Sequence, residues 1–196
     1  MNHLIVGLGN PGEEYVASRH NAGRMVLDVF RKTHDFSQWE NDKKAKGLVS
    51  KGDLHGKKLL LLLPETFMNN SGESVRTFAK TLKDAEKVIV VYDDFDLPMG
   101  TYKISWNRSS GGHNGVQSII DHLKTELFIR VRIGVSPVLS SGKIKKPHGE
   151  EAVNKFILGN FTKGEQETLK KLSKEIVQSI ESIVFDGYLV AMAKFN

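Results

Sequence analysis

Apolar residues along this chain follow two patterns, each typical of one kind of secondary structure. Short apolar runs predict buried strands. These strands lie at 3–8, 87–92, 101–106 and 129–135. Elsewhere, apolar residues recur every three to four positions, as they do on the buried face of a helix. These helices follow Asn21 and Asn70 and cover 116–123 and about 163–185.

A hairpin interrupts this alternation of strands and helices. Residues 47–52 and 58–63 are strand-like, and they flank Asp53-Leu54-His55-Gly56, which has the composition of a turn. Alternating strands and helices favour an α/β layer fold, and the hairpin adds antiparallel strands to its sheet. We therefore predict an α/β fold with a mixed twisted β-sheet flanked by helices in a single domain.

The 196 residues contain no internal repeat, no low-complexity segment and no clear linker, so one domain over 1–196 is expected. Within it, the polar Gly/Lys-rich segment at about 140–149 is expected to be a mobile basic loop. Asn70 and Glu73 stand three positions apart before an apolar period, which predicts a capping box at the start of a helix.

The composition narrows the chemistry and the compartment. The lack of cysteine excludes disulfides, thiolate metal sites and cysteine nucleophiles, and it suits a cytoplasmic protein. The N-terminus shows no signal-peptide pattern, and the apolar run 59–64 is too short to span a bilayer, so no membrane partner is expected. A formal net charge of +5 fits a polyanionic partner and equally fits solvated lysines.

Residues 7–12 spell G-x-G-x-x-G, the fingerprint of a dinucleotide-binding turn, but their surroundings do not fit such a turn. Pro11 removes a backbone N–H, and Glu13 and Glu14 would place negative charge beside a pyrophosphate. An acid is required about 20 residues further on, and Asp28, near that distance, lies within a predicted helix. We therefore reject a nucleotide cofactor and expect no cofactor.

The loop after this first strand carries polar side chains where mixed α/β sheets commonly have their sites. The candidates are Asn10, Tyr15, Arg19, His20 and Asn21. Histidine is the side chain whose unperturbed pKa, about 6.5, suits a general base near neutral pH.

Four longer motifs occur in order: "VGLGNPGEEYVASRHNAG", "PETFMNNSGESV", "VVYDDFDLPMG" and "SSGGHNGVQSII". A later segment reads "VNKFILGNF". In this order and at these spacings they resemble the bacterial peptidyl-tRNA hydrolase family, from Leu4 to about Phe161. The resemblance implies a metal-free, usually monomeric enzyme that hydrolyses the ester between a peptide and the 3′ end of tRNA. Its substrate is then peptidyl-tRNA, and its product is free tRNA that can be used again.

The resemblance also assigns roles position by position. His20 matches the family's catalytic base, and Asp93 matches the acid that supports it. Asn10, Asn69 and Asn114 match the amides that line the cleft. The residues that match those flanking the terminal adenosine and the peptide are Tyr15, Phe67 and Met68.

These assignments suit the chemistry of an activated ester. An imidazole works best as a base when a carboxylate accepts its other ring N–H, and Asp93 follows an apolar strand. No serine lies in a nucleophile-elbow context, so water is the expected nucleophile. We expect Asn69 and Asn114 to hold the water and the scissile carbonyl, and Asn10 to read the peptide amide beside the ester.

A histidine on its own is weak evidence for catalysis, and His20 is singled out because its place in the first motif, with the three other motifs at the family's spacing, matches the catalytic base. The other six are interpreted as satisfied structural groups. They are His3, His34, His55, His113, His122 and His148.

Contacts with tRNA are expected to run from basic side chains to phosphates. The candidates are Arg19, Lys103, Arg108, Arg130, Arg132, Lys143, Lys145 and Lys146. Arg130 and Arg132 would share one face of a strand and form a basic stripe. The stretch 105–110 is less rich in Lys and Gly than the resemblance implies, which leaves Lys103 and Arg108 available there.

Two rival functions stay open at this point. Asp93, Asp94 and Asp96 offer carboxylate oxygens to Mg²⁺, as a metal-dependent phosphoesterase would need. Alternatively, the chain is a non-catalytic RNA-binding module that has the basic surface and turns nothing over. Activity that resists a chelator removes the first rival, and loss of activity in a His20→Ala variant that still binds tRNA removes the second.

Overall fold

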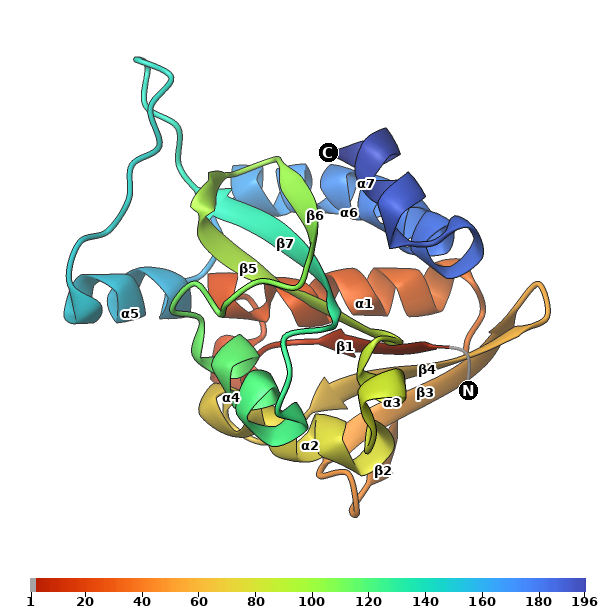
Figure 1. The fold of residues 1–196 in the computed structure, drawn as a ribbon. Helices are drawn as coiled ribbons and strands as arrows, with labels where there is room; N and C mark the ends of the chain where they lie inside the picture. Colours follow the sequence, from red (N-terminus) through yellow and green to blue (C-terminus); the bar gives the residue numbers. More distant parts are fainter. Residues whose placement is uncertain (1–2) are drawn as a thin grey trace.

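A seven-stranded mixed sheet forms the centre of the computed structural model, which describes residues 3–196 (Figure 1). Its strands are β1 (His3–Gly7), β2 (Glu40–Asp42), β3 (Gly47–Leu54), β4 (Lys57–Pro64), β5 (Val88–Pro98), β6 (Tyr102–Trp106) and β7 (Ile129–Ser136). Their spatial order is β2-β3-β4-β1-β5-β7-β6. The four strands β4, β1, β5 and β7 run parallel, whereas β2, β3 and β6 pair antiparallel with their neighbours. The predicted mixed sheet and its hairpin, β3–β4, are confirmed.

Helices cover both faces of this sheet (Figure 1). They are α1 (Ala22–Thr33), α2 (Ser71–Phe78), α3 (Leu82–Ala85), α4 (Asn114–Leu123), α5 (Glu150–Leu158), α6 (Lys163–Asp186) and α7 (Tyr188–Phe195). The core on one face includes apolar residues of α1 and α6, and the core on the other includes those of α2 and α4. Among residues 3–196, no helix combines the length and apolar character needed to cross a membrane.

The alternation of side chains along β1 explains why the central strands are apolar throughout. Ile5 belongs to the core with α1 and α6, while Leu4 and Val6 belong to the core with α2 and α4. All three side chains are fully buried, and each such burial contributes about 1.5–3 kcal/mol to stability. A strand covered on both faces therefore has a continuous apolar sequence.

The capping box expected at Asn70 and Glu73 is wrong. The side chain of Asn70 makes no capping hydrogen bond, and Glu73 forms an ion pair with Lys46. The helix α2 ends at Phe78, and a true capping box forms a few residues later, where Thr81 and Asp84 cap the short helix α3.

Two features extend beyond the expected elements. The strand expected at 87–92 is β5, which continues past Asp93 to Pro98 with an irregular register between Asp94 and Pro98. The helices α5 and α7 were not expected from the apolar period.

The parallel arrangement of β4, β1 and β5 brings three chain segments to one edge of the sheet. The 3₁₀ turns η1 (Glu13–Tyr15) and η2 (Arg19–Asn21) follow β1, and the turn η3 (Met68–Asn70) follows β4. Asp93 lies in the second half of β5, beside these turns. Crevices outside the carboxyl ends of parallel strands are the usual place for ligand sites in such folds.

Candidate active site

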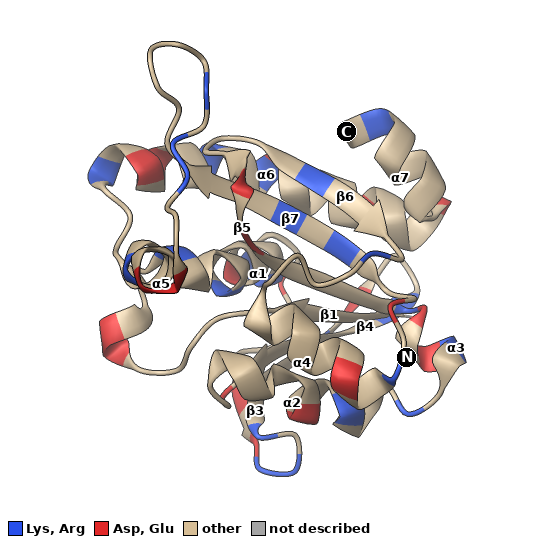
Figure 2. Cartoon of the chain, turned by 60° about the vertical axis from the view of Figure 1, so that its left-hand side comes forward, with Lys and Arg blue, Asp and Glu red and all other residues tan. Residues whose placement is uncertain are grey.

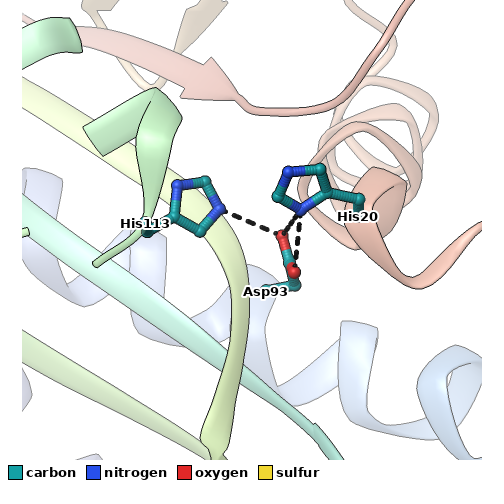
Figure 3. A group of neighbouring side chains, drawn as sticks. All are labelled: His20, Asp93 and His113. Carbon is teal, nitrogen blue, oxygen red and sulfur yellow. Dashed lines mark hydrogen bonds and ion pairs between the residues drawn. The ribbon is translucent and has the colours of Figure 1, made fainter. Parts of the chain in front are cut away.

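His20 and Asp93 stand 73 residues apart in the sequence and meet at this edge of the sheet (Figure 3). The turn η2 carries His20, and β5 carries Asp93. The Nδ1 atom of His20 lies 2.9 Å from Oδ1 and 3.0 Å from Oδ2 of Asp93. Both residues are buried, with 6% and 2% of their surface exposed. The structure thus brings the expected base and its expected carboxylate partner into direct contact.

A second histidine, His113, contacts the same carboxylate. Its Nε2 atom lies 3.2 Å from Oδ1 of Asp93, and its ring centroid lies 5.0 Å from that of His20 (Figure 3). His113 directly precedes α4, where its Nδ1 atom accepts a hydrogen bond from the backbone N–H of Val116. The interpretation of His113 as one more structural histidine overlooked this contact. We call His20, Asp93 and His113 the His–Asp–His cluster.

The hydrogen bonds fix where the protons of the cluster lie. Burial opposes ionisation of Asp93, but the charge of His20 and hydrogen bonds from His113 and His20 outweigh it and hold the pKa of this carboxyl well below its usual range. Asp93 is therefore an anion near neutral pH and accepts hydrogen bonds. The neutral ring of His20 must then carry its proton on Nδ1, which leaves a lone pair on Nε2.

The Nε2 atom of His20 is available to a substrate or to water. It has no hydrogen-bond partner among residues 3–196, and it is not among the unpaired side-chain atoms that are sealed from solvent there. In Figure 3 this nitrogen points away from Asp93. General-base catalysis by histidine requires one ring nitrogen that is held by a carboxylate and a second that can accept a proton.

The same cluster offers two nitrogens and a carboxylate within 4.8 Å of one another, a donor set that metal ions use. The second nitrogen of His113 argues against this use. A metal-bound neutral imidazole carries its proton on the other ring nitrogen and donates it. In this structure, the other nitrogen of His113 faces the N–H donor of Val116 instead. The cluster therefore fits a proton network better than a metal site.

The neighbouring acids are also already paired. Asp94 contacts Nε of Arg132 at 2.7 Å, and Asp96 contacts Nζ of Lys146 at 2.8 Å. A Mg²⁺ site formed by Asp93, Asp94 and Asp96 would require all three carboxylates to exchange their present partners.

Asn10 lies in a network of amides between the turns that follow β1 and β4. Its Oδ1 atom accepts a hydrogen bond from the backbone N–H of Met68 at 2.9 Å. Its own backbone N–H donates to Oδ1 of Asn21 at 2.8 Å, and Nδ2 of Asn21 donates back to its carbonyl at 3.0 Å. The side-chain oxygen of Asn10 is thus occupied, and its NH₂ group remains to donate.

The other predicted cleft residues surround this network at different depths. Phe67 is 59% exposed, Asn69 and Asn114 are exposed, and Tyr15 is half-buried. Met68 is buried in the core between β1 and α4. A Cβ at Gly115 would approach the Met68 sulfur to 2.4 Å, so a larger residue here would force the Met68 side chain to shift.

The chain is similar to known proteins over almost its full described length. Residues 4–196 match the family model described as "Peptidyl-tRNA hydrolase". The chain belongs to the peptidyl-tRNA hydrolase family. It is 41% identical to a peptidyl-tRNA hydrolase of a Synechococcus species, over 98% of this chain and 82% of that protein. It is 40% identical to one from Alkaliphilus oremlandii, over 99% of both chains. A crystal structure of peptidyl-tRNA hydrolase from Acinetobacter baumannii superposes with a TM-score of 0.88 at 32% identity, over 99% of this chain and 94% of that one.

A member of this family must also hold the phosphates of tRNA, and the structure changes the set of candidate cations. Arg130 is fully buried, and its guanidinium donates to the backbone carbonyls of Glu126, Phe128 and Arg108. The expected basic stripe of Arg130 and Arg132 is therefore wrong, because Arg130 supports the loop that contains Arg108. Burial lowers the pKa of Arg130.

Figure 2 shows Lys and Arg positions on β6, on β7 and on the loop after β7, and these elements carry most of the other candidate cations. Lys103 is exposed and stands opposite Arg132 in the β6–β7 pair. Arg108 is exposed in the loop before α4. A recess here is lined by side chains from β5, β7 and this loop. Its arginines are Arg108, Arg130 and Arg132.

Arg19, another cation expected to bind phosphate, is used inside the protein. Its guanidinium contacts both carboxylate oxygens of Glu165 at 2.9 and 3.1 Å and donates to the carbonyl of Gly159 at 3.2 Å. It also lies 4.7 Å from the ring centroid of Phe156. The backbone N–H of Arg19 donates to Gly159 as well. Arg19 thereby joins the turn that carries His20 to the α5–α6 junction.

Proposed function

We propose that His20 is the general base of this enzyme and that Asp93 orients it. The activity is that of the family, hydrolysis of the ester between a peptide and the 3′ end of tRNA. The observation that carries the proposal is the state of one ring: Nδ1 of His20 donates to a buried carboxylate, and Nε2 is open. An imidazole in this state takes a proton from water without help from a cofactor.

The reaction proceeds by direct attack of water. Water adds through its oxygen to the ester carbonyl carbon, and Nε2 of His20 accepts the proton that water loses. Asp93 stabilises the resulting imidazolium through its hydrogen bond to Nδ1. The tetrahedral intermediate then expels the ribose oxygen, which takes the proton back from His20. The products are a peptide with a free carboxyl group and tRNA with a free 3′ end.

The amides around the base bind the acyl group in this proposal. Asn69 of η3 and Asn114 at the start of α4 are exposed. In this proposal they donate to the carbonyl oxygen as it becomes an oxyanion, or hold the attacking water. Asn10 donates from its NH₂ group, since Met68 occupies its oxygen. An NH₂ donor pairs with a peptide carbonyl and repels an ammonium group, so it favours a blocked amino group over a free one.

The aromatic and basic residues bind the tRNA part. Tyr15 and the exposed Phe67 flank the terminal adenosine and the peptide, while Met68 contributes through its backbone. Lys103, Arg108 and Arg132 contact phosphates, which makes binding weaker at high salt. We further propose that the enzyme acts as a monomer in the cytoplasm, where its substrate arises during translation.

One experiment tests substrate class and metal dependence together. N-acetylaminoacyl-tRNA and free aminoacyl-tRNA are offered side by side to the enzyme in the presence of EDTA, and release of the acyl group is followed. We expect only the blocked ester to be cleaved. Equal cleavage of both esters would contradict the role of Asn10, and loss of cleavage in EDTA would favour a metal mechanism.

A His20→Ala variant separates an enzyme from an RNA-binding module. We expect loss of hydrolysis with nearly unchanged affinity for tRNA, because the cations that bind phosphate lie outside the cluster. Hydrolysis at the wild-type rate in this variant would rule out His20 as the base.

A further inference from the structure

We infer that His113 is a positioning residue that shares the Asp93 carboxylate with His20 and thereby sets the pH at which His20 becomes a free base. This inference rests on the proposed role of His20 as general base. Nδ1 of His20 contacts both oxygens of the Asp93 carboxylate, and Nε2 of His113 contacts one of them, Oδ1.

The structure determines which tautomer of His113 is present. Its Nδ1 atom accepts from the backbone N–H of Val116 at 3.3 Å and so carries no proton. The proton of the neutral ring is therefore on Nε2, and it is donated to Asp93 at 3.2 Å.

The surroundings hold the His113 ring in this place. His113 directly precedes α4, and α4 packs closely against Met68 at Gly115, which has no side chain. The ring also lies edge-on to Tyr92, with centroids 4.8 Å apart. Because both ring nitrogens have partners within the protein, His113 has no nitrogen left to offer to the substrate.

A neutral donor on the carboxylate weakens its pull on His20. When His20 takes a proton from water, its hydrogen bond to Asp93 becomes charge-assisted and stronger. The hydrogen bond from His113 binds one of the two oxygens that His20 contacts, so it reduces the negative charge that the imidazolium meets. Without this donor, Asp93 would favour the imidazolium more, and His20 would stay protonated up to a higher pH.

Other ionisable groups near the cluster are neutral or already paired. Burial is the main cause that raises the pKa of Tyr92 to about 12, so its phenol is neutral. Side chains with ion-pair partners on η2, α1, β5 and β7 include Arg19, Arg24, Asp94 and Arg132. Arg130, on β7, donates to backbone carbonyls. His113 is thus the group whose removal changes the charge on Asp93 most directly.

Two substitutions at this position separate its two hydrogen bonds. His113→Gln places an amide NH₂ near the position of Nε2, so it retains a donor to Asp93. His113→Asn places an amide oxygen near the position of Nδ1, so it retains the acceptor for Val116 at the start of α4 and loses the donor. The Asn variant therefore preserves the helix cap and removes only the contact under test.

The measurement is the pH profile of kcat/KM for wild type and both variants, with a ¹⁵N NMR titration of His20 in the free enzymes. We expect the acid limb of the Asn variant and the titration of His20 to move to higher pH by about one unit, a tenfold rate loss on that limb. The Gln variant is expected to follow the wild type. KM and the rate at high pH are expected to change little in either variant.

Several results would overturn the inference. One is an acid limb of the Asn variant that coincides with the wild type or moves to lower pH. Another is a rise in KM with an unmoved limb, which would mean that His113 contacts the substrate. If the Asn variant does not fold, the wild-type ¹⁵N spectrum decides: His113 with its proton on Nδ1 contradicts the inference, and on Nε2 supports it.

The His20→Ala variant keeps this test separate from the proposed function. If that variant retains wild-type activity, the general-base proposal fails together with this inference. If it is inactive while the Asn variant shows the wild-type profile, only the inference about His113 fails.

Discussion

The His–Asp–His cluster and the nearby cations lie at the same end of the sheet, but they are built in different ways. The side chains of His20, Asp93 and His113 are 7%, 2% and 10% exposed, and both histidines hydrogen-bond Asp93. Arg132 and Lys146 pair with Asp94 and Asp96, and the second of these ion pairs is about half exposed. The cluster fixes the direction of a single lone pair, whereas the cations supply positive charge.

This difference predicts which kinetic quantity each region controls. Removing one member of a buried ion pair leaves the charge of its partner without compensation, which lowers the free energy of unfolding by about 3–5 kcal/mol. A surface ion pair contributes about 0–1 kcal/mol and is screened by salt. We expect changes at His20 or Asp93 to lower kcat, and changes among the cations to raise KM and alter its dependence on salt.

The largest effect is expected from Asp93→Asn. An amide NH₂ in place of a carboxylate oxygen would donate to Nδ1 of His20 and move the ring proton to Nε2. We expect kcat to fall by about 10³–10⁴-fold, as for the wrong tautomer in other histidine-based enzymes, with little change in KM. Single-turnover hydrolysis of N-acetylaminoacyl-tRNA measures this loss.

Asp96→Asn is the matched control for that substitution. Asp96 is three residues away on the same strand, exposed, and paired with Lys146. We expect its kcat to stay close to that of the wild type. A loss of kcat in Asp93→Asn no greater than in this control would place the orienting group elsewhere.

A smaller effect, on affinity, is expected from Arg132→Gln. This change removes the proposed phosphate contact and frees Asp94 from its ion pair, and the negative charge of Asp94 then repels tRNA. We expect KM to rise several-fold at unchanged kcat, and the slope of log affinity against log salt to fall by about one.

Lys32→Gln serves as the control for Arg132→Gln, since Lys32 is an exposed cation near the C-terminal end of α1, away from η2. It removes the same charge at another site. An equal rise in KM in both variants would show that net charge, rather than the position of Arg132, governs tRNA binding.

The smallest effect is expected from Glu165→Gln, which weakens the ion pair with Arg19. Burial opposes ionisation of Glu165, but hydrogen bonds from Thr162 and Arg19 prevail and lower its pKa from 4.5. A carboxyl group whose pKa is lower in the folded than in the unfolded protein stabilises the fold at any pH above its unfolded-state pKa. This contribution is lost as the pH falls through its folded-state pKa. We expect a loss of stability of a few tenths to about 1 kcal/mol at pH 7.

Thermal melts of wild type and Glu165→Gln at neutral and acid pH check this sign. The difference in Tm is expected at pH 7 and should shrink as pH falls below 4.5, the value from which the pKa of Glu165 is lowered. A difference that grows toward acid pH would mean that the carboxylate is not stabilised by Arg19.

The fold was predictable from sequence wherever one physical preference dominated. The apolar runs identified β1 and the first half of β5, because these strands are buried on both faces. The second half of β5 was not predicted, because Asp93, Asp94 and Asp96 interrupt the apolar run where the strand leaves the core. The helix α5 was not predicted either, because Ile157 is its one buried residue and a single buried position gives no helical period.

The candidate site was predictable only as far as motifs reveal it. The motifs singled out His20 and Asp93, and the structure brings them into contact. Contacts that depend on tertiary packing leave no signal in a single sequence. For that reason His113 was grouped with the structural histidines, and Arg19 and Arg130 were counted among the cations that face tRNA.

The pH dependence of single-turnover hydrolysis tests most directly the central claim that the open nitrogen of His20 takes a proton from water. The account predicts a rate that falls about tenfold per pH unit once His20 is protonated and levels off at higher pH. It also predicts that this acid limb disappears from the residual activity of His20→Ala. A wild-type rate independent of pH between about 5 and 8, or an unchanged acid limb in His20→Ala, would contradict the claim.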